Sequence, residues 1–206
     1  MADDALDHSR YFWQGKKVRL RPLRPEDAES AYVASLDSPT RQDLQLGVEL
    51  PTSVEGLRSA LEKWYDCRKA DGAIVMVIET LGGENVGGIS LHSTDQKNGV
   101  FSFGVNVDRR HRGRGYAEEA VLMLLRYCFM ERRYQKCNSA CVHTNGASLA
   151  LHRKLGFVEE GRVRRHWFFN GRYHDDVMFG MTVEEFIELH GQEPGNRDGE
   201  SGRVTG

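Results

Sequence analysis

The sequence lacks a hydrophobic run long enough to cross a membrane. Its most apolar stretches, residues 73–78 and 121–125, are much shorter than the roughly 20 apolar residues that a membrane-spanning helix needs. The first ten residues are mainly acidic or polar, and they contain no apolar segment of the kind found in a secretory signal. We therefore expect a cytoplasmic protein without a membrane partner.

Cysteine is sparse, and its spacing excludes the usual metal and disulfide frameworks. The four cysteines, Cys67, Cys128, Cys137 and Cys141, form no C-x-x-C pair. Cys137 and Cys141 are spaced to share one face of a strand, but two thiols alone make neither a zinc site nor a disulfide framework. We expect buried, reduced thiols and no metal.

The chain also lacks a strong net charge. Its 28 Lys and Arg residues nearly balance 30 Asp and Glu residues, and the formal net charge is −2. A protein that attracts nucleic acid through its overall electrostatic field would be strongly basic, so a nucleic-acid partner is disfavoured. The length of 206 residues and the hydrophobic fraction of 39% are typical of one globular domain with one core.

The hydrophobic patterns predict one α+β domain over residues 15–190, with a mixed, twisted sheet of six to seven strands flanked by four to five helices. A flexible arm is expected over residues 1–14. A disordered tail is expected over residues 191–206, which hold five glycines and one apolar side chain, Val204. Strand patterns cover residues 17–23, 73–80, 85–91, 99–107, 136–142, 157–169 and 173–181. Helical patterns cover residues 25–36, 53–70, 145–155 and 182–189, and a further helix begins near residue 116.

Turn and cap residues set several of these boundaries. Asn170-Gly171 lies between two strand patterns and is a strong signal for a type I′ hairpin. Gly156 suits the left-handed residue that ends many helices. Residues 37–53 contain two prolines and show weak periodicity, so we expect a loop there with room for one helical turn. Such a loop is a natural position for acceptor specificity.

The most informative stretch is the cationic, glycine-punctuated turn over residues 108–115. It follows the strand that ends at Val107 and leads directly into the helix that begins near Tyr116. Glycines let the backbone approach a ligand closely, and the first turn of a helix carries unpaired N–H groups and positive partial charge. We interpret the turn as a cradle for a cofactor pyrophosphate, although a turn with solvated arginines remains the plain alternative.

Two other nucleotide motifs do not fit this turn. A dinucleotide fingerprint would need a small residue where the chain has Glu118. A Walker loop would need Gly-Lys-Ser or Gly-Lys-Thr, which the sequence does not contain.

A second polar motif begins about 30 residues later, at Asn145. At helical spacing Asn145, Ser148 and His152 fall on one stripe, away from the apolar Leu151 and Leu155. Taken singly, each has an ordinary explanation, since Asn145 is a good N-cap and His152 would be an exposed helix residue. Taken together, we interpret them as part of a site.

The two motifs together resemble the signature motifs of the GNAT acetyltransferase superfamily. The first is Arg110-x-x-Gly113-x-Gly115, and the second runs from Asn145 to Lys154-Leu-Gly-Phe. The order of elements from about residue 17 to residue 182 follows that family. The residues of the last hairpin are similar to the branch that holds the RimJ/RimL-like ribosomal-protein N-terminal acetyltransferases and the spermidine acetyltransferases.

The resemblance implies a GNAT-like fold with acetyl-CoA as the donor. It places the pyrophosphate on the backbone amides of residues 112–117. It also places the pantetheine arm beside the strand that ends at Val107, between that strand and the one that begins near Lys136. The expected cofactor-binding residues are Asn106, Val107, Arg110, Arg112, Gly113, Arg114, Gly115, Tyr116, Ala117, Asn145, Ser148 and Lys154.

Acyl transfer from a thioester to an amine also needs an oxyanion donor, an acid for the departing thiolate and a path for the amine proton. Backbone N–H groups around Asn106 and Val107 are the expected oxyanion donors if the strand is interrupted there. His152 stands where many relatives have a tyrosine, and Ser148 matches a serine given a catalytic or CoA-binding role in the N-terminal acetyltransferase branch. Both are candidate acids.

The base is harder to assign. The RimL-like branch has a glutamate before the aromatic residues of the late hairpin, and this chain has Arg165-His166-Trp167 there. His166 or a water chain, and then Glu160 or Asp175, are the candidates that remain.

The late hairpin carries several cationic side chains, which bear on the acceptor. They are Arg162, Arg164, Arg165 and Arg172. A cationic rim repels polyamines and suits an acceptor with carboxylates, although Asp175 and Asp176 temper this argument. We expect a protein N-terminal amine or an amino-acid-like amine. A polyamine acceptor, a non-catalytic CoA-binding module and an RNA-associated accessory protein are the alternatives, and a homodimer is left open.

Overall fold

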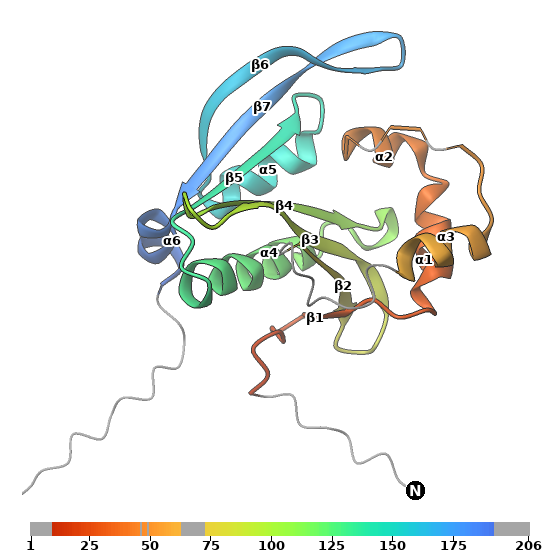
Figure 1. The fold of residues 1–206 in the computed structure, drawn as a ribbon, viewed down its shortest axis with the longest axis horizontal. Coiled ribbons are helices and arrows are strands. Elements are labelled where there is room, and N and C mark those ends of the chain that lie inside the picture. Colours follow the sequence, from red (N-terminus) through yellow and green to blue (C-terminus); the bar gives the residue numbers. More distant parts are fainter. Residues whose placement is uncertain (1–9, 46, 49, 63–72, 192–206) are drawn as a thin grey trace, which may run out of the picture.

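The computed structural model describes residues 10–45, 47–48, 50–62 and 73–191 (Figure 1). Seven strands form one sheet in the order β1-β2-β3-β4-β5-β7-β6. The strands are β1 (Val18–Pro22), β2 (Ile74–Thr80), β3 (Asn85–Asp95), β4 (Val100–Val107), β5 (Lys136–Val142), β6 (Val158–Phe169) and β7 (Arg172–Thr182). The helices are α1 (Asp27–Ser35), α2 (Ser38–Asp43), α3 (Val54–Glu62), α4 (Tyr116–Arg126), α5 (Gly146–Leu155) and α6 (Val183–His190). The predicted mixed α+β fold is confirmed.

One opening in the sheet organises the rest of the molecule. Every pair of neighbouring strands in the sheet is antiparallel except β4 and β5, which run parallel. These two strands pair only where residues 100–102 face residues 136–138. Beyond Ser102 they diverge, and the gap between them widens toward the ends of both strands (Figure 1).

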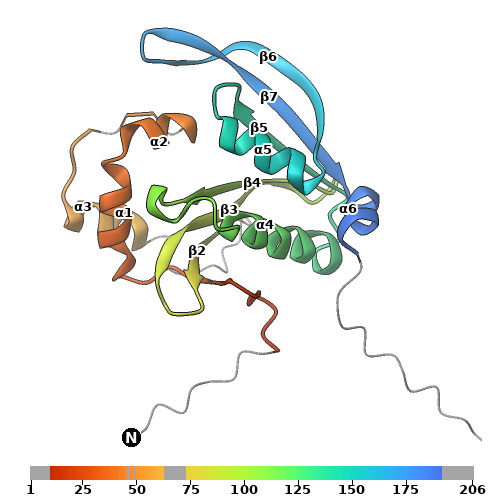
Figure 2. The ribbon, with the colours of Figure 1, turned by 180° about the vertical axis from the view of Figure 1, so that it is seen from behind.

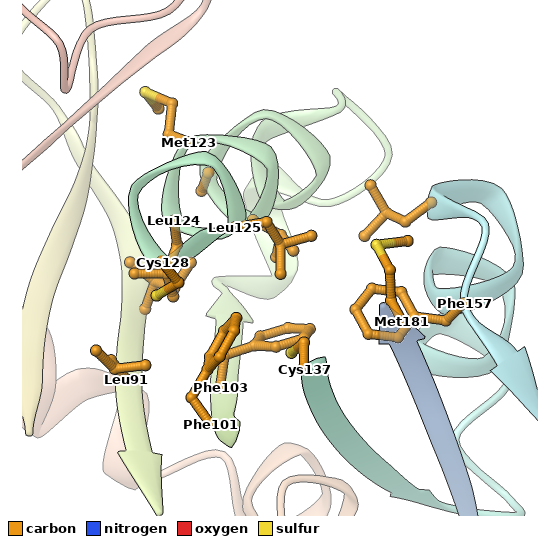
Figure 3. Close-up of a cluster of buried hydrophobic side chains, with 14 of the residues drawn as sticks. Leu91, Phe101, Phe103, Met123, Leu124, Leu125, Cys128, Cys137, Phe157 and Met181 are labelled. Carbon is orange, nitrogen blue, oxygen red and sulfur yellow. The ribbon is translucent and has the colours of Figure 1, made fainter. Parts of the chain in front are cut away.

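The helix α4 packs its apolar stripe against the sheet beneath this opening. Ala120, Val121 and Leu124 are fully buried, as the helical spacing predicts, and Leu125 widens the buried face. Figure 3 shows Leu124 and Leu125 facing the aromatic side chains of β4. Each large apolar side chain buried in this way contributes roughly 1.5–3 kcal/mol. The core therefore holds the first turn of α4 in place next to the end of β4.

The helices α1, α2 and α3 gather at the end of the molecule away from α6 (Figures 1 and 2). A buried ionic network fixes the start of α1 to the sheet. Arg21 donates to both carboxylate oxygens of Asp27 at 2.7 and 2.9 Å and also pairs with Glu79 of β2. Arg19 pairs with the other oxygen of Glu79 at 2.7 Å, and Asn85 donates to Asp27 at 2.8 Å.

The segment just before β1 is held against the domain. A flexible arm was expected over residues 1–14, but Trp13 is held in place. Its ring packs against Tyr127 with ring centroids 4.9 Å apart. The Trp13 carbonyl also accepts a hydrogen bond from the backbone of Leu20 at 2.8 Å. Residues 192–206 of the predicted tail lie outside the described residues, as do residues 63–70 of the predicted second helix.

The predicted hairpin turn and the predicted helix cap at Gly156 are both present. Asn170 and Gly171 have φ values of 50° and 70°, so the hairpin between β6 and β7 has the predicted type I′ geometry. Gly156 caps α5 with φ of 89°, and Thr182 forms a capping box with Glu185 at the start of α6. Within the described residues, no helix is long and apolar enough to cross a membrane.

The thiols in the described part of the chain are buried and unpaired. Cys128, Cys137 and Cys141 are each at most 3% exposed. Burial raises the pKa of Cys128 to about 12 and also raises the pKa of Cys137 and Cys141. The prediction of buried, reduced thiols is confirmed for these three, and Cys67 lies outside the described residues.

Candidate functional site

The glycine-punctuated turn forms an open corner at the start of α4. Gly113 and Gly115 have φ values of 76° and 81°, a left-handed conformation that favours glycine. Gly115 occupies the N-cap position of α4, where it offers no side chain to the first N–H groups of the helix. A Cβ on Gly115 would lie 2.7 Å from Lys17 Nζ, whereas a Cβ on Gly113 would meet nothing within 4 Å. The corner therefore presents backbone donors, with the ammonium of Lys17 beside them.

A pocket of about 390 Å³ extends from this corner between α4 and α5. Among the predicted cofactor-binding residues, all except Arg110 and Arg114 line it. Those two side chains are exposed on the outer side of the turn, where Arg114 Nη2 donates to the Arg110 carbonyl at 3.4 Å. Lys154 Nζ pairs with Glu118 Oε2 at 2.6 Å and so links α5 to α4 along the pocket wall.

The helix α2 forms a wall of this pocket that the sequence reasoning missed. Thr40 and Asp43 of this helix and its C-cap residue Leu44 line the pocket. The segment was expected to be a loop with room for one helical turn, and that turn is the short helix α2, which Asp37 caps by accepting a hydrogen bond from the Thr40 backbone at 3.2 Å. An Asp followed two residues later by Pro39 is a helix-start signal that could have identified it.

Three polar contacts hold α2 over the site. Arg112 Nη2 donates to Thr40 Oγ1 at 3.0 Å, and Asn145 Nδ2 donates to the Asp43 carbonyl at 3.2 Å. The side-chain amides of Gln42 and Asn170 bond reciprocally at 3.0 and 3.1 Å, so the tip of the β6–β7 hairpin reaches the helix. The turn before α4, the start of α5 and the hairpin therefore all fix the position of α2.

A second pocket, of about 690 Å³, lies on the other side of α2 among α1, α3 and strands β2–β4. It shares Thr40, Leu44 and residues 105–107 with the first pocket. The two pockets therefore meet at the end of β4. A thioester in the first pocket and a nucleophile in the second would face each other there.

The condition set for oxyanion donors around Asn106, an interruption of the strand there, is not met on the β3 side, because β4 pairs with β3 in continuous register from Ser102 to Val107. Asp108 donates to the Val86 carbonyl at 2.9 Å, and antiparallel pairing alternates, so the amide of Asn106 also points toward β3. The amides of Val105 and Val107 then point the other way, into the space that the divergence of β5 leaves open. Val105, which the sequence reasoning did not select, replaces Asn106 as a potential backbone donor.

Of the three residues of the second motif, Asn145 and Ser148 line the first pocket and His152 does not. Asn145 caps α5 through its side-chain oxygen, which accepts from the Ser148 amide at 3.0 Å. Ser148 is partly exposed and lines the first pocket. His152 faces the core instead, so the stripe predicted from helical spacing does not face one site.

His152 lies outside both pockets and is only 3% exposed. Its Nδ1 donates to the Ser148 carbonyl at 2.8 Å, and its Nε2 accepts from Ser139 Oγ at 2.8 Å. The ring stacks on Phe179 with centroids 4.7 Å apart. Burial lowers the pKa of His152, and the hydrogen bond to Ser148 offsets this effect only in part. A buried neutral imidazole with both nitrogens bonded does not suit the acid role expected for His152.

The base candidates of the hairpin are also placed away from the pockets. Glu160 pairs with Lys136 at 2.6 Å, and Asp175 accepts from the Arg165 backbone at 2.9 Å. His166 packs edge-on against Trp167. None of these candidates lines either pocket. The ionisable side chains that do line the second pocket include His92, Asp37 and Asp108, and the sequence reasoning singled out none of them.

In the described part of the chain, no three His, Cys, Asp or Glu side chains converge as metal ligands. The donors that line the first pocket are backbone amides, the guanidinium group of Arg112 and hydroxyls. This set suits a phosphate-bearing ligand.

Comparison with known proteins identifies similar chains. A family model described as "Acetyltransferase (GNAT) domain" matches residues 17–158. The chain is 36% identical over 180 residues to the SPbeta prophage-derived uncharacterized N-acetyltransferase YokL of Bacillus subtilis, an alignment that covers 87% of this chain and 98% of that protein.

Solved structures show the same fold at lower identity. The spermidine N-acetyltransferase from Vibrio cholerae in complex with CoA and spermine matches with a TM-score of 0.74 and 20% identity, covering 84% of this chain and 99% of that one. The ribosomal L7/L12 alpha-N-protein acetyltransferase RimL matches with a TM-score of 0.69 and 21% identity, covering 82% and 91%. At this identity the likeness supports the fold alone.

Proposed function

Because this chain belongs to the GNAT N-acetyltransferase family, we propose that it transfers an acetyl group from acetyl-CoA to a primary amine by direct attack on the thioester. The observation that carries this proposal is the meeting of the two pockets at residues 105–107, where β5 has diverged from β4. The first pocket, here called the donor pocket, contains the corner at the start of α4 where a diphosphate would bind. The second pocket, here called the acceptor pocket, has a volume of about 690 Å³ and is large enough for an amine-bearing group. We also propose that the protein is cytoplasmic.

The donor would bind through the backbone. We assign the diphosphate to the amides of residues 113–117, with Lys17 adding positive charge beside Gly115. The pantetheine arm would run along β4 toward Val105 in the gap beside β5. The amides of Val105 and Val107 would then stabilise the oxyanion that forms on the thioester carbonyl.

Ser148 is the proposed acid for the leaving thiolate. It is partly exposed, lines the donor pocket, and is held in place by the capping interaction of its amide with Asn145. Its hydroxyl lies 3.4 Å from Nδ1 of His152. His152 would therefore position the serine without contacting the substrate.

For the acceptor, we favour a protein N-terminal amine or an amino-acid-like amine. Arg162, Arg164, Arg165 and Arg172 are all exposed on the hairpin whose tip contacts α2, and this cationic surface favours an acceptor that carries carboxylates. A polyamine is the second candidate, because Asp37 and Asp108 line the acceptor pocket. The two candidates differ in charge, since the first carries carboxylates and a polyamine is cationic.

A panel of amines tests the reaction and separates these acceptors. The purified protein would be incubated with acetyl-CoA and, in turn, peptides with free N-termini, amino acids and polyamines, and free thiol release and product mass would be measured. We expect amine-dependent thiol release, with peptides or amino acids ahead of spermidine. CoA binding without amine-dependent thiol release across the panel would instead indicate a non-catalytic CoA-binding module.

A further inference from the structure

The floor of the acceptor pocket is a polar depression on one face of β3 and β4. The paired positions Ser90 and Gly104, and His92 and Ser102, lie on this face. A Cβ on Gly104 would lie 3.0 Å from Ser90 Oγ and 3.7 Å from His92 Nε2. The missing side chain at Gly104 thus leaves space in front of the imidazole. The next residue is Val105, whose amide points into the donor pocket.

The pairing of β3 with β4 becomes irregular directly after His92. The register between β3 and β4 shifts between His92 and Asp95, and Ser93 has a φ of 50°, a strained value for serine. His92 Nδ1 lies 3.2 Å from Ser93 Oγ. In the neutral tautomer with its proton on Nδ1, Nε2 holds a lone pair, and this nitrogen lies near the space that the missing side chain of Gly104 leaves.

We propose that His92 is the catalytic proton acceptor for the substrate amine, a role that rests on the acetyl transfer proposed above. The neutral amine attacks the carbonyl carbon of the thioester, the C–N bond forms, and the C–S bond breaks. The nitrogen loses one proton to Nε2 of His92, which later releases it to solvent. The departing thiolate takes a proton from Ser148 or from solvent. An acceptor that arrives as an ammonium ion loses its extra proton before the attack.

The electrostatics of the pocket fit a base that is neutral at physiological pH. Burial lowers the pKa of His92, and a hydrogen bond to the Phe103 backbone raises it in part. That backbone carbonyl would stabilise the imidazolium after proton transfer. The other charged groups that line the pocket come from α1, α2 and the turn after β4. They are Asp27, Asp37, Arg41, Asp108 and Arg109.

Asp108 is the competing base in this pocket, and its position is less favourable. It lies beyond the last residue of β4, among the cationic side chains of the cradle turn, whereas His92 faces Gly104 in the middle of the strand pair. Burial raises the pKa of Asp108, and the charges of His111 and Arg110 oppose this effect. We assign Asp108 to the charge balance of the turn.

The test compares His92→Gln with two matched variants, Asp108→Asn and His166→Gln. His166 is a histidine outside both pockets, so its substitution controls for the loss of an imidazole. For the acceptor with the highest rate, kcat, KM and the dissociation constant of CoA would be measured between pH 5 and pH 9. His92→Gln should lower kcat by roughly 10²–10⁴ at pH 7 and leave CoA binding unchanged. When kcat/KM is calculated on the concentration of neutral amine, its acidic limb should disappear in this variant, and added imidazole should restore part of the rate of His92→Ala.

The kinetics of the variants distinguish His92 from Asp108 as the base. A kcat within threefold of the unaltered enzyme in His92→Gln overturns the role of His92, and a large loss confined to Asp108→Asn moves the role to that carboxylate. A lowered rate with an unchanged pH profile and no imidazole rescue also overturns it, because a structural defect would produce that pattern. If the unaltered protein acetylates no amine, the proposed function fails, and the role of His92 fails with it.

Discussion

At the scale of single residues, the environment of a side chain decides its role more than its place in a motif. His152 and His92 are both histidines whose pKa is lowered by burial. His152 has both nitrogens bonded inside an aromatic cage, whereas His92 lines a pocket, with its Nε2 near the space that Gly104 leaves. The first arrangement supports packing, and the second supports proton transfer.

His152→Ala should damage stability more than chemistry. Removing the buried ring leaves a cavity next to Phe179 and an unpaired Ser139 hydroxyl, so the free energy of unfolding should fall by about 2–4 kcal/mol. Turnover per folded molecule should fall less than tenfold. Denaturant unfolding and kinetics on the same preparation check this, and a loss of 10² or more in kcat at unchanged stability would return His152 to the role of acid.

The same residue predicts a pH dependence of stability. Because the pKa of His152 is lower in the folded than in the unfolded state, the unfolded state binds more protons below the ordinary value near 6.5. Stability is therefore complete above that value and decreases as the pH falls from about 6.5 toward 5. In His152→Gln this part of the decrease should be smaller, as urea titrations at pH 5, 6 and 7 would reveal. An equal decrease in both proteins would contradict the account.

At the scale of elements, predictions based on local chemistry succeeded and those that needed tertiary partners did not. The type I′ hairpin, the cap at Gly156 and the glycine turn before α4 were predictable because each depends on a few adjacent residues. For residues 37–53 the sequence predicted only a loop with room for one helical turn; it predicted neither the bounds of α2 nor its place over the site, since its partners Arg112 and Asn170 are distant in the sequence.

The face of α5 was misjudged for a related reason. Helical spacing groups Ser148 with His152, but it does not say which side of the helix the core occupies. The divergence of β5 from β4 has no signature in either strand. His92 could have been found only by pairing β3 with β4, which places it next to Gly104.

The cradle can be tested with a pair of glycines that share one conformation. Gly115→Val forces a branched residue into a φ of 81° against Lys17, and it should raise the dissociation constant of CoA at least tenfold. Gly83→Val is the matched control, because Gly83 has a φ of 88° in the turn between β2 and β3, outside both pockets. The control should lose stability but keep its CoA affinity in calorimetric titrations. Equal affinity of both variants and the unaltered protein would refute the cradle.

At the scale of the whole molecule, the buried ionic network of Arg21, Asp27 and Glu79 attaches the start of α1 to the sheet. The helix α1 forms part of the wall of the acceptor pocket. Burial alone would raise the pKa of Asp27 and Glu79, but their bonds to Arg21 outweigh it, and both values lie below the ordinary ones. The network joins α1 to β1 and β2, and Asp27 itself lines the pocket. Acceptor binding and acid stability should therefore respond to the same residues.

Arg21→Gln leaves two buried carboxylates without their shared cation and should lower the free energy of unfolding by about 3–5 kcal/mol. In the unaltered protein, the contribution of the depressed carboxylates is present above about pH 4.5 and is lost as the pH falls through their folded-state pKa values. The variant should show a flatter pH dependence below pH 5. Thermal unfolding at several pH values measures both effects, and a variant that keeps the full acid dependence would contradict the network.

The whole account depends on the donor pocket between α4 and α5 and its junction with the acceptor pocket at the end of β4. A crystal structure with bound CoA tests this most directly. We predict diphosphate oxygens within about 3 Å of the amides of residues 113–117, and a pantetheine arm that runs along β4 beside Val105 and Val107, in the gap left by β5. A CoA molecule bound elsewhere, or a diphosphate held only by side chains with the pantetheine outside this gap, would contradict it.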